Sequence, residues 1–336
     1  PKRVMVSFLG IAVVACIAFS MATSFGALLA ARILGGVGVS ACLMAPLTGY
    51  RRWLEPATQL RANSWMLMTG SFGMLASTLP VQWLVPVLGW RPLFWALAAM
   101  IALSMVVIAV LVPAWNHGPV ADDVRQTSYS QVWRNPYFRR MTPIGFFSYG
   151  GMIAIQTLWA GPWLVRVTGD PPLAAAGGLF TINLSMLAAF LTWGALNPRL
   201  ARSGLTTDRL IAFGMPLNLL VLAAIIVAGP LAGAWSWALF CVSCTFVSLA
   251  QPAVAMAFAP ELAGRALSGY NLVIFSGVFI VQWGIGLLID AFSALGLDTI
   301  GSFRGALLVF LACSAASYGY FMLANRDNHG TATESP

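Results

Sequence analysis

Six side chains that can form hydrogen bonds lie inside long hydrophobic runs. Placing a polar group in such a run costs free energy, so its presence indicates a functional role. A guanidinium, amide, phenol or indole group held at depth in a membrane can bind a solute or line a water-accessible path. For the amides of Gln156 and Asn183, the alternative is a hydrogen bond between helices, worth under about 1 kcal/mol. For the two aromatic residues, it is packing or anchoring. The six residues are Arg32, Gln156, Asn183, Gln282, Tyr149 and Trp159.

Arg32 is the cation at depth. It lies seven residues into the run from Phe25 to Gly49, which places it about 10 Å from the start of that run at ~1.5 Å per helical residue. An arginine at this depth either snorkels outward or projects into a hydrated cavity. In a cavity it would suit an anionic substrate or a carboxylate partner. The residues alone leave both positions open.

Acidic residues fall in loops or in the tail, with Asp290 at the outer edge of a run. A proton-coupled carrier needs a titratable group whose pKa changes with the state of the carrier. Since these runs offer no such carboxylate, coupling to protons would require a group elsewhere in the protein. The other possibility is an uncoupled carrier.

Catalytic and metal-binding constellations are missing from the sequence. A membrane-embedded enzyme would need a nucleophile with a base, a titratable dyad or a set of metal ligands inside the runs. Cys241 and Cys244 form a CxxC, but neither His117 nor His329 is near in sequence, and we interpret the pair as small apolar residues at a helix contact. We therefore expect no enzyme activity, no cofactor and no metal site.

The composition is that of a polytopic membrane protein. Of the 336 residues, 59% are hydrophobic and 8% are charged, against about 25% charged residues in soluble domains. The hydrophobic runs lack the two-residue alternation of a barrel strand and reach the ~20 residues that a helix needs to cross a bilayer. We thus predict an all-α fold with spans at 4–23, 25–49, 62–88, 91–112, 141–165, 173–197, 208–229, 232–259, 266–289 and 303–324.

The basic residues predict the topology. With the N-terminus inside, the loops on the outer side hold only Arg32, Arg91, Arg166 and Arg304 of the 18 Lys and Arg residues. This bias predicts both termini in the cytoplasm. The net charge of +8 is spread over loops, so we expect the lipid bilayer as a partner and no nucleic acid.

The longest polar interval predicts the domain organisation. We expect a first helical bundle at residues 1–113, a cytoplasmic linker at 114–140, a six-helix bundle at 141–325 and a cytoplasmic tail at 326–336. Pro46, Arg61 and Ser64 match Pro252, Arg265 and Ser268 in order, and a VQW triplet follows in each copy. Such a duplication implies six spans in each half, so we expect an N-terminally truncated chain that lacks its first two transmembrane helices.

The motifs resemble those of the major facilitator superfamily. "PKRV" resembles the end of a Gly-x-x-x-Asp-Arg-x-Gly-Arg-Lys motif, with Lys2 and Arg3 at its basic positions. "RILGGVG" resembles the fourth-helix motif, with Arg32, Gly36 and Gly38 in place. A degenerate second copy of the first motif, with Asn197 where the acid stands, contains Gly194, Arg199 and Arg202.

The resemblance implies two six-helix bundles, of which ten of twelve helices are present here. It also implies that Arg32 faces the interior of the first bundle, in a role linked to proton transfer or helix coupling. The fifth-helix region "TGSFGMLASTLPVQW" lacks the Gly-Pro-x-x-Gly-Gly motif of drug antiporters, which makes drug efflux a weaker expectation.

We expect a secondary active transporter that moves a small solute across the plasma (inner) membrane by alternating access. Arg32 and the uncharged polar groups favour an organic anion or a sugar-phosphate-like cargo, with protons as a candidate coupling partner and a monomer as the working unit. The alternative is a transporter-like membrane sensor.

Overall fold

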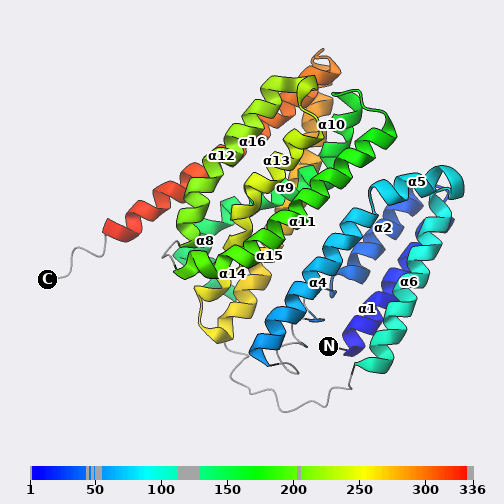
Figure 1. The fold of residues 1–336 in the computed structure, drawn as a ribbon, viewed down its shortest axis with the longest axis horizontal. Coiled ribbons are helices and arrows are strands. Elements are labelled where there is room, and N and C mark those ends of the chain that lie inside the picture. The colour runs from blue at the N-terminus through cyan, green and yellow to red at the C-terminus, as the bar shows by residue number, and fades with distance from the viewer. Residues whose placement is uncertain are drawn as a thin grey trace. The chain divides into compact units, whose positions relative to one another are not determined.

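The computed structural model describes residues 2–42, 45–46, 49, 55–112, 129–202 and 206–330. Throughout these residues the regular secondary structure is helical (Figure 1). The chain divides into two compact units, Pro1–Val120 and Ala121–Pro336, which we call the N-terminal and the C-terminal unit. The division falls within residues 114–140.

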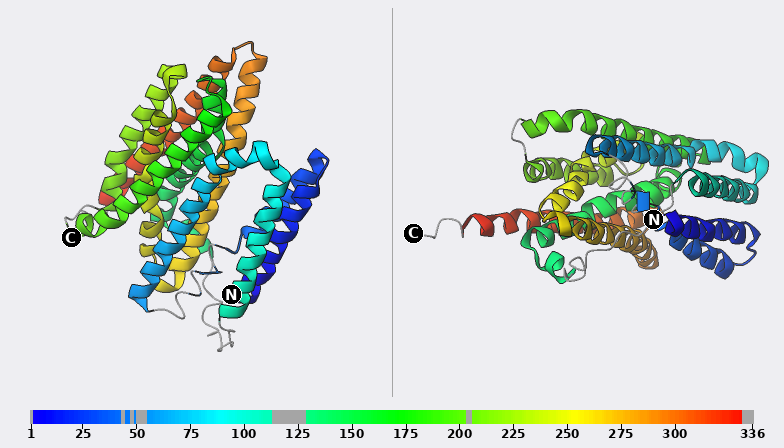
Figure 2. Two further views of the ribbon diagram at one scale, coloured as in Figure 1. Left: turned by 45° about the vertical axis from the view of Figure 1, so that its right-hand side comes forward. Right: turned by 90° about the horizontal axis from the view of Figure 1, so that it is seen from below.

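The N-terminal unit is built around α1, which packs against both α2 and α6 (Figure 2). Its helices are α1 (Lys2–Met21), α2 (Phe25–Val39), α4 (Pro56–Ala76), α5 (Leu79–Leu88) and α6 (Trp90–Leu111). Gly38 allows the close approach of α1 and α2, because a Cβ there would lie 2.6 Å from the Cα of Ala12. Arg91 on α6 donates to the carbonyls of Ser20 and Ala22 and so fixes the turn after α1.

The C-terminal unit begins with a helical path that contains two π-helical segments. The path runs through α7 (Tyr129–Arg134), α8 (Pro136–Pro143), the π-helical η2 (Ile144–Gly150), α9 (Gly151–Ala154), the π-helical η3 (Ile155–Trp159) and α10 (Ala160–Arg166). Longer helices follow: α11 (Pro172–Arg202), α12 (Thr207–Ala228), α13 (Ala234–Cys244), α14 (Ala250–Met256), α15 (Pro260–Ala294) and α16 (Thr299–Gly330). Short 3-10 turns, η4 (Gly229–Leu231) and η5 (Thr245–Leu249), join α12 to α13 and α13 to α14.

Glycine lets the π-helical segment η2 lie directly on α15. A Cβ at Gly150 would lie 2.6 Å from the carbonyl oxygen of Ile274, and one at Gly277 would lie 2.8 Å from the carbonyl carbon of Phe146. Each helix thus presents a glycine to the backbone of the other, which is how helices in membranes gain close van der Waals contact. This contact holds the segment that carries Tyr149.

The described residues contain seven helices that are long and apolar enough to cross a membrane, or eight if α4 and α5 form one span bent by 42°. This confirms the all-α polytopic fold. Some predicted spans differ in detail: the run at 25–49 forms the 15-residue helix α2 and is helical again at residues 45–46 and 49, and the run at 141–165 is divided by its π-helical segments. The difference arises because hydropathy reports apolar length, whereas helix winding depends on local packing.

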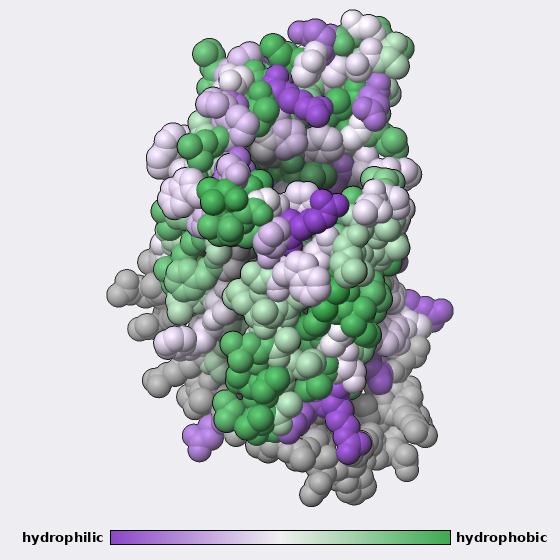
Figure 3. Space-filling view, turned by 90° about the vertical axis from the view of Figure 1, so that its right-hand side faces the viewer, coloured by the Kyte–Doolittle hydropathy of each residue, from purple (hydrophilic) through white to green (hydrophobic). Residues whose placement is uncertain are grey.

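The surface carries large apolar side chains, as expected for contact with lipid tails. On α6, Met100, Leu103, Val110 and Leu111 are exposed. Figure 3 shows a face of the molecule on which hydrophobic residues cover wide areas and hydrophilic ones are scattered. A soluble protein rarely exposes apolar patches of this extent.

Candidate functional site

Two of the predicted site residues meet in the core of the C-terminal unit. The Nε2 atom of Gln156, on η3, donates to Oδ1 of Asn183, on α11, over 2.8 Å. The two residues are only 7% and 9% exposed. This single hydrogen bond uses one N–H of Gln156 and the oxygen of Asn183. Each amide has one acceptor oxygen and two N–H donors in all. The two amides therefore keep hydrogen-bonding capacity beyond their mutual bond.

Trp159 and Gln282 form a second contact, between η3 and α15. The indole Nε1 of Trp159 donates to the backbone carbonyl of Gln282 over 3.0 Å. The amide Nε2 of Gln282 in turn donates to Oγ1 of Thr157 over 2.9 Å. Sequence reasoning placed Trp159 and Gln282 in the site separately, and the structure brings them together on facing helices.

A cavity of about 400 Å³ lies beside this contact, within the C-terminal unit. Its walls are mainly aromatic and aliphatic, with the Gln282 amide and the Asp290 carboxylate as its polar groups. The lining residues are Leu158, Trp159, Phe279, Gln282, Trp283, Gly286, Leu287 and Asp290. Such a mixture of apolar walls and a few polar groups is typical of small-molecule sites.

Tyr149 lies apart from these contacts, on the other π-helical segment, where it is half-buried against the hydrophobic core. Its neighbour Ser148 accepts a hydrogen bond at its carbonyl from the thiol of Cys244, on α13, over 3.5 Å. Cys241 and Cys244 are both buried, and among the described residues no group of three His, Cys, Asp or Glu side chains could hold a metal ion.

Arg32 lies on α2 in the N-terminal unit with an exposed side chain. Within the described part of the chain, no carboxylate pairs with its guanidinium and no hydrogen bond engages it. The two glycines of its motif differ, because a Cβ at Gly36 would meet open space whereas Gly38 packs on α1. The guanidinium is thus available to an anionic partner.

The basic residues of the two resembling motifs lie at helix ends. Lys2 and Arg3 are in the first turn of α1. Gly194, Arg199 and Arg202 belong to the last turns of α11, and their side chains lie outside the described residues.

Sequence reasoning missed a buried ion pair in the C-terminal unit. Nη1 of Arg140, on α8, lies 2.5 Å from Oδ2 of Asp208, in the first turn of α12. Nε of Arg140 also donates to the carbonyl of Phe321 on α16, and the guanidinium lies over the ring of Phe321. Arg140 is 4% exposed, so three helices meet around one buried charge.

Tyr137 completes this cluster. Its hydroxyl donates to Oδ1 of Asp208 over 2.9 Å. Burial, together with the negative charge of Asp208 and this hydrogen bond, raises the pKa of Tyr137 above its usual value. From the sequence, Arg140 and Asp208 were inner-loop charges 68 residues apart, and no local signal could pair them.

Comparison with known proteins identifies the family. The model of the Major Facilitator Superfamily matches residues 1–282. The chain belongs to the major facilitator superfamily (MFS). No curated protein matches it.

Solved MFS transporters share the fold. A bacterial homologue of the human lysosomal transporter Spinster, in an inward-facing and unoccupied conformation, has a TM-score of 0.67 at 13% identity, over 97% of this chain and 83% of that one. The MFS transporter FucP, in the outward conformation, has a TM-score of 0.65 at 14% identity, over 96% of this chain and 83% of that one. The prediction of a multi-pass membrane protein of the secondary transporter class is confirmed.

Proposed function

We propose that this MFS protein moves a small organic anion or a sugar-phosphate-like solute across the plasma membrane by alternating access. It would act as a monomer with both termini in the cytoplasm. The observation that carries the proposal is the buried amide pair Gln156 and Asn183, held on the π-helical segment η3 and on α11.

The weak hydrogen bond of the amide pair suits reversible binding of a solute. Hydrogen bonds between membrane helices are worth about 0.6 kcal/mol on average, so replacing the Gln156–Asn183 bond by bonds to a solute hydroxyl costs little. π-helical segments are frequent at functional sites because they shift side chains out of the regular helical register. The segment η3 carries both Gln156 and Trp159, which gives one short element an amide and an indole for recognition.

Arg32 supports an anionic group on the cargo. A guanidinium matches the planar geometry of carboxylate or phosphate and can bind either through two parallel hydrogen bonds. Asp290, in the cavity beside Trp159, would repel an anion there. We therefore assign the recognition of an anionic group to Arg32 in the N-terminal unit, and the hydrogen bonding of uncharged polar groups to the amide pair in the C-terminal unit.

The basic helix ends would act in gating. We propose that Lys2 and Arg3, with the second copy containing Gly194, Arg199 and Arg202, hold the inner ends of their helices through charged contacts that break and form during transport.

Uptake by proteoliposomes that hold the full-length protein tests the proposal. A panel of organic anions, sugar phosphates and neutral solutes is screened with and without a proton gradient, which also reports the coupling. We expect accumulation of an anion that Arg32→Gln abolishes and that Arg166→Gln preserves. Arg166 is the matched control because it is also an exposed arginine, at the end of α10. Equal transport by both variants would overturn the role of Arg32.

The amide pair needs a test that separates binding from folding. Removing one amide leaves the other buried without its partner, whereas replacing both by leucine leaves no unpaired group and is close to neutral for stability. We expect the double variant Gln156→Leu, Asn183→Leu to fold and to lose transport. Retained transport would show that the bond only joins helices. Binding of a solute without uptake would favour the alternative, a transporter-like sensor.

A further inference from the structure

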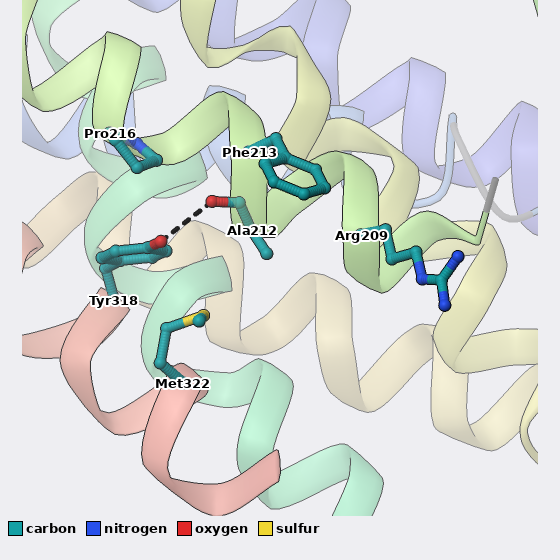
Figure 4. Close-up of a pocket in the computed structure, with 6 residues that line it drawn as sticks. All are labelled: Arg209, Ala212, Phe213, Pro216, Tyr318 and Met322. Carbon is teal, nitrogen blue, oxygen red and sulfur yellow. Dashed lines mark hydrogen bonds between the residues drawn. The ribbon is translucent and has the colours of Figure 1, made fainter. Parts of the chain in front are cut away.

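A groove on the surface of the C-terminal unit lies between α12 and α16, and its volume is about 600 Å³. The amide pair Gln156 and Asn183 is not among its lining residues. Arg209, Ala212, Phe213 and Pro216 line it from α12, and Tyr318 and Met322 line it from α16. We call it the α12–α16 groove. Figure 4 shows Tyr318 and Met322 beside Ala212, with Pro216 and Arg209 at opposite ends of the α12 wall. Its volume is within the about 300–1,000 Å³ of small-molecule sites.

Proline shapes the polar floor of the groove. Pro216 has no N–H, so the carbonyl of Ala212, four residues before it, loses its usual donor within the helix. The hydroxyl of Tyr318 donates to this carbonyl over 2.8 Å (Figure 4). The exposed backbone group is thereby satisfied across the two helices. The rest of the groove, apart from Arg209, offers mainly apolar contact to a bound molecule.

The charge lies at one end of the groove. Asp208 is already paired with Arg140, and among the described residues no carboxylate pairs with Arg209. Arg209 is exposed in the first turn of α12, where the backbone N–H groups add a partial positive charge. The basic bias of the loops places this end at the cytoplasmic leaflet, whose lipids include anionic ones.

We propose that the α12–α16 groove binds one anionic phospholipid, with its phosphate at Arg209 and an acyl chain along Phe213, Pro216 and Met322. The pattern of one cation at the interface followed by an apolar wall fits this occupant. A free phosphate would leave the apolar wall unused, and a zwitterionic lipid carries a cationic headgroup beside its phosphate, which weakens its net attraction to the arginine. Phe213, which is 78% exposed, has the side chain surface to cover an acyl chain.

Native mass spectrometry of the detergent-purified protein tests this site. Dioleoylphosphatidylglycerol and dioleoylphosphatidylcholine are added in parallel, and the fraction of protein that retains each lipid is measured. We expect preferential retention of the anionic lipid and a loss of about fivefold in Arg209→Gln, as for one basic contact at a membrane surface. Phe213→Ala should lower the retention of both lipids. Since both side chains are exposed, neither variant removes core packing.

Arg166→Gln serves as the control, because it removes an equal charge at the end of α10, a helix that does not line the groove. Retention unchanged in Arg209→Gln, equal retention of the two lipids, or equal binding of free glycerol 3-phosphate would each overturn the proposal. Another membrane protein co-purified in place of lipid and displaced by Phe213→Ala would overturn it as well.

Discussion

Asp208→Asn should destabilise the C-terminal unit strongly. The substitution keeps the shape of the side chain and an oxygen that can accept the hydrogen bond of Tyr137, but it removes the countercharge of Arg140. The Arg140 side chain is 5% exposed and that of Asp208 is 28% exposed, so the guanidinium cannot turn to water to replace its partner. The Phe321 carbonyl and ring remain in contact with it.

The expected loss of stability follows from the different exposure of the two side chains. Breaking a fully buried ion pair at one partner costs about 3–5 kcal/mol, and since water reaches the Asp208 side, we expect about 2–3 kcal/mol. For a unit that spans residues 121–336, each kcal/mol corresponds to about 2–4 °C of melting temperature. The variant should therefore melt about 5–10 °C below the parent protein.

Thermal unfolding followed with a thiol-reactive fluorescent dye measures the loss. Cys241 and Cys244 are buried and react only when the unit opens, provided that Cys16, Cys42 and Cys313 are first replaced by serine. Asp170→Asn is the matched control, since no basic residue pairs with Asp170 in the described structure.

Replacing the pair by apolar residues, Arg140→Met with Asp208→Leu, should recover much of the stability. A melting temperature of Asp208→Asn equal to that of Asp170→Asn would refute the reasoning.

Three further predictions concern single contacts. Gly277→Ala places a methyl group against the backbone of Phe146 and should cost about 1–3 kcal/mol in thermal unfolding, whereas Gly284→Ala on the same helix meets open space and should cost little. Tyr318→Phe leaves a backbone carbonyl unpaired and should lower stability by about 1 kcal/mol in the same assay. The raised pKa of Tyr137 means that the folded state holds this proton more tightly, so stability should be constant below about pH 10 and fall above it, and Tyr137→Phe should lessen that fall. An identical alkaline profile in the two proteins would contradict this assignment.

The sequence by itself determined the class of the molecule. Apolar runs long enough to cross a bilayer can be satisfied only by helices, because the backbone must form its hydrogen bonds within each span. The same runs made Gln156 and Asn183 conspicuous, since a polar side chain within such a run is costly. Motifs such as that around Arg32 then indicated the family.

Only the tertiary structure decided which polar groups meet. Gln156 and Asn183 are separated by 27 residues and Arg140 and Asp208 by 68, so helix packing alone determines that the first pair bonds and that the second becomes a buried charge cluster. The π-helical winding of η2 and η3 was also hidden from the sequence, because hydropathy is the same whether a residue is in an α-helix or a π-helix. Composition reports what each residue prefers, and contact between distant helices depends on how their surfaces fit together.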